Sequence, residues 1–125
     1  MTDRLLRAIE CPWVDVIAHP TGKLILRRDP SRANMERVFD SAAAHGVALE
    51  INSLPDRLDL DDVQARHARD RGAKLIIDSD AHSPAALGNL RWGATVARRA
   101  WLETHDVLNT QPVGLFRASL RRNRR

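Results

Sequence analysis

Short apolar runs alternate with helical segments along most of the chain, and this alternation restricts the folds that it can adopt. Three runs rich in valine, leucine, isoleucine and alanine predict strands at 14–18, 47–52 and 74–77. Two segments with apolar residues at helical spacing lie between them, at 34–45 and 61–71. Each segment is directly followed by a glycine, Gly46 or Gly72. Glycine readily adopts the left-handed conformation that often ends a helix. The alternation predicts parallel βαβ units and therefore an α/β fold.

Further elements are expected on either side of this pattern. Helices are predicted at 2–10, 90–101 and 113–120, and a brief extended or turn segment at 106–109. Thr2 is the candidate cap of the first helix, and Ser83 the candidate cap of a short turn after the third strand. No repeat, low-complexity segment or interdomain linker interrupts the chain, so its 125 residues predict one domain or a piece of a larger one.

The composition excludes several classes of protein. With 43% hydrophobic and 29% charged residues the chain is neither disordered nor fibrous. No apolar run approaches the roughly 20 residues that span a bilayer, and the charged N-terminal segment is not a signal peptide. Cys11 is the single cysteine, which excludes an internal disulfide and fits a reducing compartment. A soluble, cytoplasmic chain is expected.

Positive charge is concentrated at the C-terminal end. The chain has eighteen arginines, two lysines and a formal net charge of +4. Five arginines fall within residues 117–125: Arg117, Arg121, Arg122, Arg124 and Arg125. A basic tail of this kind can hold the phosphate backbone of a nucleic acid through charge alone. The alternative is a solvated terminus without a ligand.

Three polar residues occupy equivalent positions in successive βα units. His19, Glu50 and Asp80 lie at or near the C-terminal ends of the predicted strands, 31 and 30 residues apart. One βαβ unit takes about 30 residues, so parallel strands would bring these side chains to one edge of the sheet. Ligands bind and chemistry occurs at that edge in α/β folds. His82 follows Asp80 closely enough to reach the same edge.

Carboxylates and imidazoles are the ordinary ligands of Zn²⁺, Mn²⁺ and Fe²⁺. Metals held this way activate water and neutralise charge that builds on a phosphoryl oxygen. Each residue also has a plainer interpretation: His19 precedes a proline and can be a loop residue, and Asp80 can cap the helix that follows. Glu50 is harder to dismiss, because a carboxylate inside an apolar strand is costly to bury without a partner.

The motifs around these residues resemble those of a known superfamily. His19–Gly22 (HPTG), Leu49–Asn52 (LEIN) and Ser79–Ser83 (SDAHS) are similar to the later motifs of the PHP (polymerase and histidinol phosphatase) metal-dependent phosphoesterases. HPTGKLILRRDP, PDRLDL at 55–60 and RWGATVARRAWLETHDVLNT at 91–110 resemble, more narrowly, the C-terminal PHP domain of bacterial family X DNA polymerases. The resemblance covers about residues 10–115.

This resemblance implies a distorted (βα)7 barrel with a cluster of Mn²⁺ or Zn²⁺ ions, and 3′–5′ exonuclease or related phosphoesterase activity on DNA ends in repair. The metal ligands and catalytic residues that it implies are His19, Asp80 and His82. The residues that it places in supporting or substrate-binding roles are Glu50 and Asn52, and Arg27 and Arg28 lie beside His19, where they could hold DNA phosphates. Solvated loop arginines are the alternative for the last two.

The chain also departs from the family pattern. The family's first motif is a His-x-His, and this sequence has none. Residues 1–125 are therefore expected to form a partial PHP domain, the last three βα units of an incomplete barrel, with metals incompletely bound. The strand residues expected to be only partly buried are Val16, Ile17, Leu49, Ile51, Leu75, Ile76 and Ile77, which predicts poor solubility or self-association. His45, His67 and His105 are expected at the surface.

Three classes of function remain open. The first is a segment of a DNA-processing phosphoesterase that is active only with the missing motifs supplied, with a histidinol-phosphatase-like enzyme as a variant of this class. The second is a non-catalytic DNA-binding remnant that uses the basic tail and the Arg98–Arg99 pair. The third is a complementing subunit that pairs with a separate N-terminal half of the PHP domain or with a polymerase domain.

Overall fold

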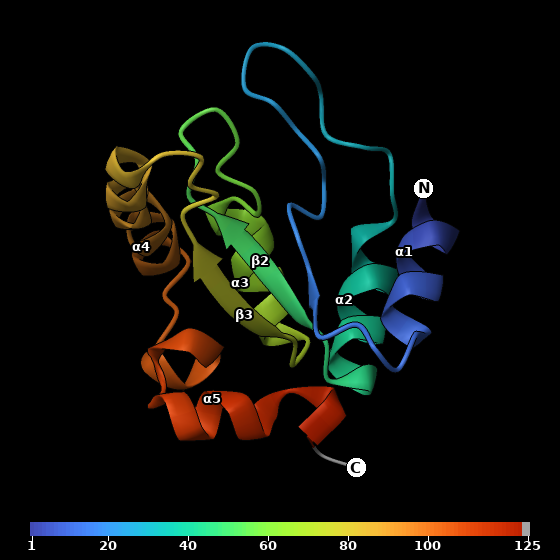
Figure 1. Ribbon diagram of the computed structural model, residues 1–125. Coiled ribbons are helices and arrows are strands. Elements are labelled where there is room, and N and C mark those ends of the chain that lie inside the picture. Colours follow the sequence, from blue (N-terminus) through green and yellow to red (C-terminus); the bar gives the residue numbers. More distant parts are fainter. Residues whose placement is uncertain (124–125) are drawn as a thin grey trace.

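A three-stranded parallel sheet forms the centre of the computed structural model, which describes residues 1–123 (Figure 1). The strands are β1 (Val16–Ile17), β2 (Ala48–Asn52) and β3 (Lys74–Asp78), in the spatial order β1-β2-β3. Glu50 lies opposite Ile76, and Asn52 lies opposite Asp78. All pairs are parallel, so the predicted α/β class with βαβ connections is confirmed.

Five α-helices connect and flank the strands. They are α1 (Thr2–Glu10), α2 (Met35–His45), α3 (Asp62–Asp70), α4 (Leu90–Arg99) and α5 (Val113–Ser119). Shorter 3₁₀ turns lie at Pro84–Asn89, Thr104–Asp106, Leu108–Thr110 and Arg121–Asn123. None of the helices within residues 1–123 is both long and apolar enough to cross a bilayer.

The two helices between strands are capped by their own sequences. The Asn34 side chain accepts a hydrogen bond from the backbone N of Arg37 at 3.1 Å, and α2 then ends at Gly46, which has a φ of 66°. The Asp61 side chain accepts from the backbone N of Gln64 at 2.9 Å and starts α3. These caps satisfy backbone groups that a helix end leaves unpaired, and they explain why the predicted boundaries of both helices are confirmed.

Of the two predicted caps, Thr2 was wrong, and Ser83 is confirmed in its position only. Met1, not Thr2, occupies the cap position of α1. Thr2 lies inside the helix, and its hydroxyl accepts a hydrogen bond from the backbone N of Asn34 at 2.9 Å, which ties α1 to the start of α2. Ser83 does precede the 3₁₀ turn, but its side chain makes no capping hydrogen bond.

The first strand and the fourth helix are shorter than predicted. β1 has two residues instead of the expected 14–18, because only Val16 and Ile17 pair with β2. α4 ends at Arg99, where side chains of α3 bind its last carbonyl groups: Arg66 donates to Arg99 O at 2.9 Å. Arg69 donates to Trp101 O at 2.6 Å, and Trp101 turns away with a φ of 58°.

One face of the sheet forms the hydrophobic core. Side chains alternate along a strand, so Leu49 and Ile51 of β2 share a face with Leu75 of β3. These three have no exposed surface, because α2, α3 and α4 pack over them. The expectation that they would be only partly buried was therefore wrong, and it was also wrong for Ile17. It is confirmed for Val16, Ile76 and Ile77.

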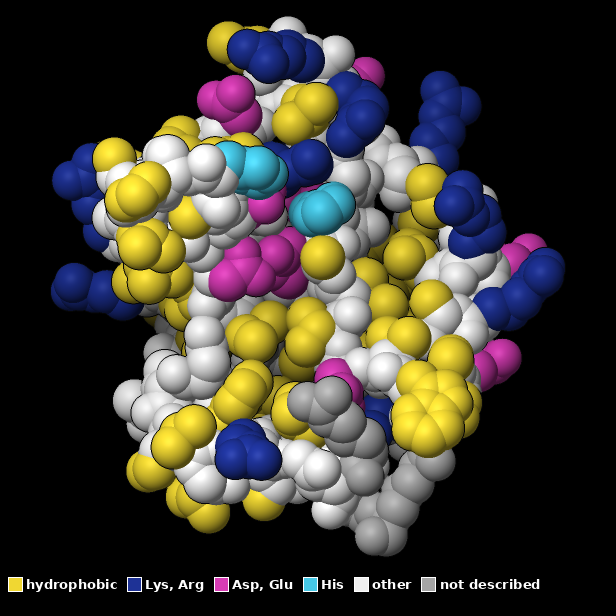
Figure 2. All heavy atoms as spheres, in the orientation of Figure 1, with side chains coloured by type: hydrophobic (Ala, Val, Ile, Leu, Met, Phe, Trp, Pro, Cys, Tyr) yellow, Lys and Arg dark blue, Asp and Glu magenta, His cyan; other side chains and the backbone are white. Residues whose placement is uncertain are grey.

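The opposite face of the sheet carries polar side chains. The register places Glu50 and Asn52 of β2 on this face together with Ile76 and Asp78 of β3. Figure 2 shows acidic side chains gathered at the centre of the visible face, with histidines above them and hydrophobic side chains below. The acidic group lies at the carboxyl ends of the strands, where the sequence predicted a site.

The outer edge of β3 is covered by the segment predicted to be extended or turn. Val107 forms a parallel bridge with Leu75. The Asn109 side chain then pairs with the backbone of Ile77, accepting from its N at 3.1 Å and donating to its O at 2.6 Å. These contacts satisfy backbone groups that an edge strand would expose.

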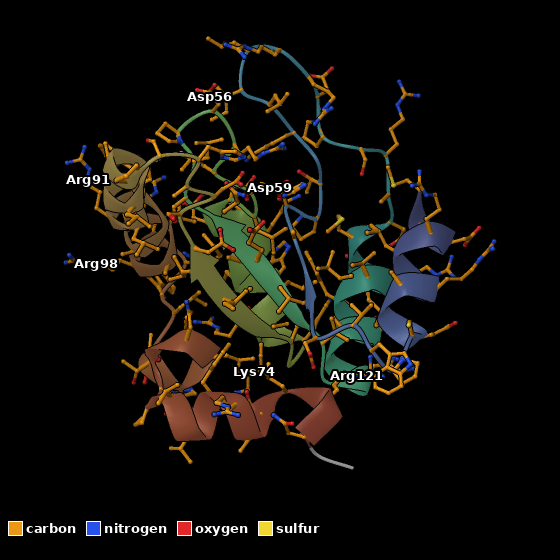
Figure 3. All side chains as sticks on the ribbon, in the orientation of Figure 1. Asp56, Asp59, Lys74, Arg91, Arg98 and Arg121 are labelled. Carbon is orange, nitrogen blue, oxygen red and sulfur yellow. The ribbon has the colours of Figure 1, made fainter. Side chains whose placement is uncertain are left out.

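The basic C-terminal end has a structural role that the sequence analysis did not predict. One guanidinium nitrogen of Arg121 donates to three backbone carbonyls, those of Ile9 at 2.8 Å, Cys11 at 2.9 Å and Val14 at 3.1 Å. The backbone N of Arg121 donates to the Asp15 side chain at 2.6 Å. The residue thus joins the C-terminal segment to the loop between α1 and β1 (Figure 3). Arg117 is exposed, whereas the remaining tail arginines, Arg122, Arg124 and Arg125, fall outside the described side chains.

Candidate functional site

The polar residues predicted to share one edge of the sheet are in contact there. The backbone N of His19 donates to Glu50 Oε2, and the His19 Nδ1 atom lies 3.5 Å from the same oxygen. The Asn52 amide donates to both Glu50 oxygens at 3.3 Å and to Asp80 Oδ2 at 3.1 Å. The convergence of His19, Glu50 and Asp80 is therefore confirmed, and Asn52 links two of them.

Local backbone geometry places these groups where the strands end. His19 and Asp80 both follow a strand and both have positive φ, 30° and 49°. Residues other than glycine rarely adopt such values, and they are typical of residues that a functional or structural contact holds in place. The backbone N of Asp80 donates to Asp78 Oδ1 at 3.1 Å, which stabilises this turn of the chain.

Glu50 is the most perturbed acid of the site. Its side chain is only 4% exposed, and burial is the main reason why its pKa is raised from 4.5 to about 8. A hydrogen bond shared with the Asp78 carboxyl and the negative charge of that group raise this pKa further. The backbone N of His19 and the Asn52 amide oppose the shift by stabilising the carboxylate. The carboxyl groups of Glu50 and Asp78 are thus in contact at the strand ends, where Glu50 is buried.

Asp78 also belongs to the site and was not predicted. The third strand was predicted to end at Ile77, whereas the structure includes Asp78 in β3, opposite Asn52. Its position two residues before Asp80 was the signal that could have identified it, since alternation places both side chains of an i, i+2 pair on one face while the strand continues.

Arg57 was also missed, although the motif at 55–60 contains it. The loop 53–58 leaves β2 and returns to pair with it, because Asn52 and Asp59 exchange backbone hydrogen bonds of 2.6 and 3.3 Å. This turn carries the Arg57 Nε atom to 3.6 Å from Asp80 Oδ2, and its Nη1 donates to Lys23 O at 3.4 Å. Arg57 is thus a largely buried cation beside the acids of the site.

His82 lies at the outer rim of the site, with its side chain 82% exposed. Its Nδ1 atom lies 2.7 Å from Asp80 O, and because a carbonyl only accepts hydrogen bonds, Nδ1 carries the proton. The Nε2 lone pair is then available. Histidines that bind metals usually have this arrangement, in which the second ring nitrogen donates to a carbonyl or carboxylate.

Arg27 and Arg28 lie farther from the acids, on the loop that follows β1. Arg27 is exposed and its nearest acid is Asp56, at 3.9 Å. Arg28 Nε donates to Gly22 O at 2.7 Å and bridges the base of the loop. Among the interactions of residues 1–123, neither arginine contacts an acid of the site. Their role in phosphate binding stays a prediction.

The side chains present fit part of a metal site. Among residues 1–123, no group of three or more His, Cys, Asp and Glu side chains meets in the arrangement of a metal site. The donors meet in pairs instead: His19 with Glu50, Glu50 with Asp78, and Asp80 with His82. The buried Nδ1 atom of His19 has no hydrogen-bond partner. An imidazole nitrogen without a hydrogen-bond partner and two adjoining acids are groups that a divalent cation would satisfy.

The shifted pKa of Glu50 predicts how stability depends on pH in the chelator-treated chain. A raised pKa in the folded state means that folding favours the protonated form of Glu50. The contribution of this group to the free energy of unfolding is therefore full below pH 4.5 and is lost as the pH rises through about 8. Between pH 7 and 9 the free energy of unfolding should fall by about 1 kcal/mol from this group. Urea denaturation in the presence of a chelator measures it.

Glu50→Gln is the control for this prediction, since the amide has the shape of the acid and does not titrate. Its free energy of unfolding should change less between pH 7 and 9 than that of the unmodified chain. Parallel pH profiles for the two chains would contradict the assignment of the shift to Glu50.

The fold and the site together define a mixed α/β segment whose acids and histidines lie at the carboxyl ends of parallel strands. Over 96% of its length the chain is 39% identical to the C-terminal part of the DNA polymerase/3′-5′ exonuclease PolX of Bacillus subtilis (strain 168). Over 99% of its length it is 30% identical to a probable phosphatase of Thermoanaerobacter sp. (strain X514). Over 92% it is 27% identical to a probable phosphatase of Shewanella sp. (strain ANA-3).

These similarities confirm the resemblance to a family X DNA polymerase, and the other relatives named here are probable phosphatases. The chain spans 21% of the Bacillus subtilis protein and 50% of the Thermoanaerobacter protein. No family model matches the chain.

Proposed function

We propose that this chain is the C-terminal part of a metal-dependent PHP phosphoesterase that cleaves DNA from its 3′ end, as in a family X polymerase acting in repair. The observation that carries the proposal is the meeting of His19, Glu50, Asn52 and Asp80 at the carboxyl ends of three parallel strands. The similarity to a protein named a DNA polymerase/3′-5′ exonuclease supports DNA as the substrate in this proposal.

The residues of this chain have distinct roles in the proposal. His19, Asp80 and His82 would hold Mn²⁺ or Zn²⁺, and the bound ion would activate water and neutralise charge on the phosphoryl group. Glu50 holds the backbone of His19, and Asn52 orients the carboxylate of Asp80. Asp78 supplies a further carboxylate next to Glu50.

The proposal includes a requirement for additional ligands. Because the described donors meet in pairs, and a structural or catalytic zinc needs at least three protein ligands, the rest of the site would come from upstream units of the barrel. The partly buried residues Val16 and Ile76 lie on the polar face, which an upstream unit would cover in a closed barrel. The chain by itself would therefore bind metal weakly and be inactive.

A chimaera tests this proposal. In this chimaera, the chain replaces the matched segment of the Bacillus subtilis PolX protein and is fused to the part of that protein that precedes the segment. We expect Mn²⁺-dependent shortening of a 5′-labelled DNA strand, reduced at least 100-fold in Asp80→Ala and His82→Ala, since a lost metal ligand typically costs at least as much as a lost supporting residue. The chain alone should retain less than one metal ion after desalting and leave the DNA intact.

Several results would contradict parts of the proposal. Hydrolysis of DNA by the chain alone would show that the upstream units are not needed. Cleavage of p-nitrophenyl phosphate but not DNA by the chimaera would favour the phosphatase function suggested by the other relatives. Unchanged activity in both variants would remove His82 and Asp80 from the site.

A complementing subunit is a second candidate, and the same partly buried sheet face favours it. In that case the upstream half would be a separate chain, and co-expression of the two halves would yield a stable complex. The DNA-binding remnant is supported less well, because Arg99 pairs with Asp62 at 3.0 Å and Arg121 holds backbone carbonyls. Arg91 and Arg98 do point away from α4 into solvent (Figure 3).

A further inference from the structure

A pocket of about 360 Å³ lies where the loops that follow β1 and β2 meet helix α4. Segments that follow all three strands line it: the loop after β1, the loop after β2 and helix α4 after β3. Its apolar wall consists of Ile25, Leu58, Trp92 and Val96. The volume is sufficient for one planar aromatic ring system with room for solvent.

The aromatic wall of the pocket is accessible. Trp92 and Ile25 are 41% and 42% exposed, although both are large apolar side chains. The guanidinium of Arg91 lies over the Trp92 ring, 4.7 Å from its centre, so a base can stack only on the other face of the indole. An exposed tryptophan with a neighbouring arginine is typical of sites where nucleic acid bases stack.

The charges of the pocket select a base over a phosphate. Asp61 and Asp62 line it, and each is neutralised by a cation of the same pocket: Lys23 lies 3.6 Å from Asp61, and Arg99 lies 3.0 Å from Asp62. Because these four charges cancel in pairs, the pocket offers no net positive charge to a phosphate. A neutral base brings no charge, and its amino and ring N–H groups are donors that carboxylates accept.

The pocket is connected to the acids of the site through Arg57. Its Nη1 atom donates to Lys23 O at 3.4 Å, and its Nε atom lies 3.6 Å from Asp80 Oδ2. Lys23 lines the pocket, whereas Asp80 belongs to the site. Arg57 therefore joins the pocket to the site, and its guanidinium is a group of the kind that holds phosphates.

We propose that the pocket formed by Ile25, Leu58, Trp92 and Val96 binds an unpaired nucleobase of the DNA strand, stacked on Trp92. This inference rests on the proposed function for its substrate, and it names the feature that distinguishes a nucleic acid from a small phosphoester. A base that stacks on Trp92 is unpaired, so the strand is single-stranded where it enters the pocket.

Tryptophan fluorescence of the 125-residue chain tests the inference. The chain has three tryptophans, so the Trp13→Phe/Trp101→Phe variant reports on Trp92 alone. A short single-stranded deoxyoligonucleotide should quench this emission, and an abasic oligonucleotide of the same length should not. Circular dichroism establishes that each variant is folded.

Affinity measurements provide the second readout. Trp92→Leu should weaken oligonucleotide binding roughly tenfold, the scale of one lost base stack. Trp101→Leu is the matched control, because Trp101 is also exposed but follows the opposite end of α4 and packs against Arg66 outside the pocket. It should leave the affinity unchanged.

The inference is overturned if the abasic oligonucleotide quenches Trp92 equally, or if Trp92→Leu and Trp101→Leu bind alike. It is also overturned if no oligonucleotide affects Trp92, in which case the pocket fits an apolar segment of a protein. Failure of the chimaera to cleave DNA is a separate outcome: base-dependent quenching would then stand while the proposed hydrolysis falls.

Discussion

Replacement of Gly93 by alanine should lower the free energy of unfolding by about 3 kcal/mol, at the upper end of the range for overpacking a core. Gly93 is buried in α4 at the point where this helix crosses the sheet. An added Cβ atom would lie 2.0 Å from Ser53 Oγ and 2.6 Å from Ile77 Cγ2. Neither distance is tolerable, so α4 would have to move away from β2 and β3. Urea denaturation measures the loss.

Two variants make this prediction specific. Gly114→Ala in α5 is the matched control, because a Cβ atom there meets nothing within 4 Å, and it should stabilise the chain slightly through helix propensity. Ser53→Ala in the Gly93→Ala background removes the nearer clash and should recover part of the loss. Equal stabilities of Gly93→Ala and Gly114→Ala would show that α4 does not pack this closely.

The close approach of α4 also matters for the site. Ser53 follows β2 directly and Trp92 precedes Gly93, so the spacing between helix and sheet determines where the pocket wall lies relative to the site acids. A displaced α4 should weaken oligonucleotide quenching of Trp92 even at temperatures where the Gly93→Ala chain remains folded.

The main elements of the fold could be predicted because local signals and tertiary contacts agree. Asn34 and Asp61 are good helix caps in isolation and cap α2 and α3 in the structure, and Gly46 adopts the left-handed conformation that glycine favours. The burial of Leu49 and Leu75 could not be predicted correctly by considering the sheet alone. Three helices cover that face, and their packing depends on residues such as Gly93 that carry no local signal of contact.

The strand-end residues of the candidate site could be predicted from the sequence, but the residues that contact them could not. His19, Glu50 and Asp80 recur at one position in each βα unit, and parallel strands convert that recurrence into proximity. Arg57 has no such periodic position, because the loop 53–58 folds back on β2 through the backbone pairing of Asn52 with Asp59. Arg121 contacts residues more than 100 positions away, a separation at which no local pattern applies.

Substitution of Asp59 should also lower the stability of the fold strongly, because this residue joins the loop after β1 to the loop after β2. Its side chain is completely buried and accepts from the backbone N of Gly22 at 2.9 Å and of Thr21 at 3.1 Å (Figure 3). Burial raises the pKa of this acid, although the bonds from Thr21 and Gly22 act in the opposite direction. The carboxylate is thus retained at a cost in solvation, which indicates that its two backbone contacts are important for the loop.

Asp59→Ala should lower the free energy of unfolding by about 3 kcal/mol, because it leaves buried N–H donors unsatisfied and opens a cavity. Asp59→Asn should cost less, since its amide oxygen can still accept one of these bonds. Asp56→Ala is the matched control in the same loop: Asp56 is exposed and its ion pair with Arg27 is long, 3.9 Å, so the change should be within about 0.5 kcal/mol.

Hydrogen exchange at the amides of Thr21 and Gly22 separates a local effect from a global one. In Asp59→Ala both amides should exchange faster relative to those of β2, and oligonucleotide quenching of Trp92 should weaken, because Lys23 and Ile25 follow the released residues into the pocket wall. If the two amides stay as protected as in the unmodified chain while stability falls, the loop is held by other contacts. The link from Asp59 to the pocket would then be wrong, and the loss of stability would reflect the cavity alone.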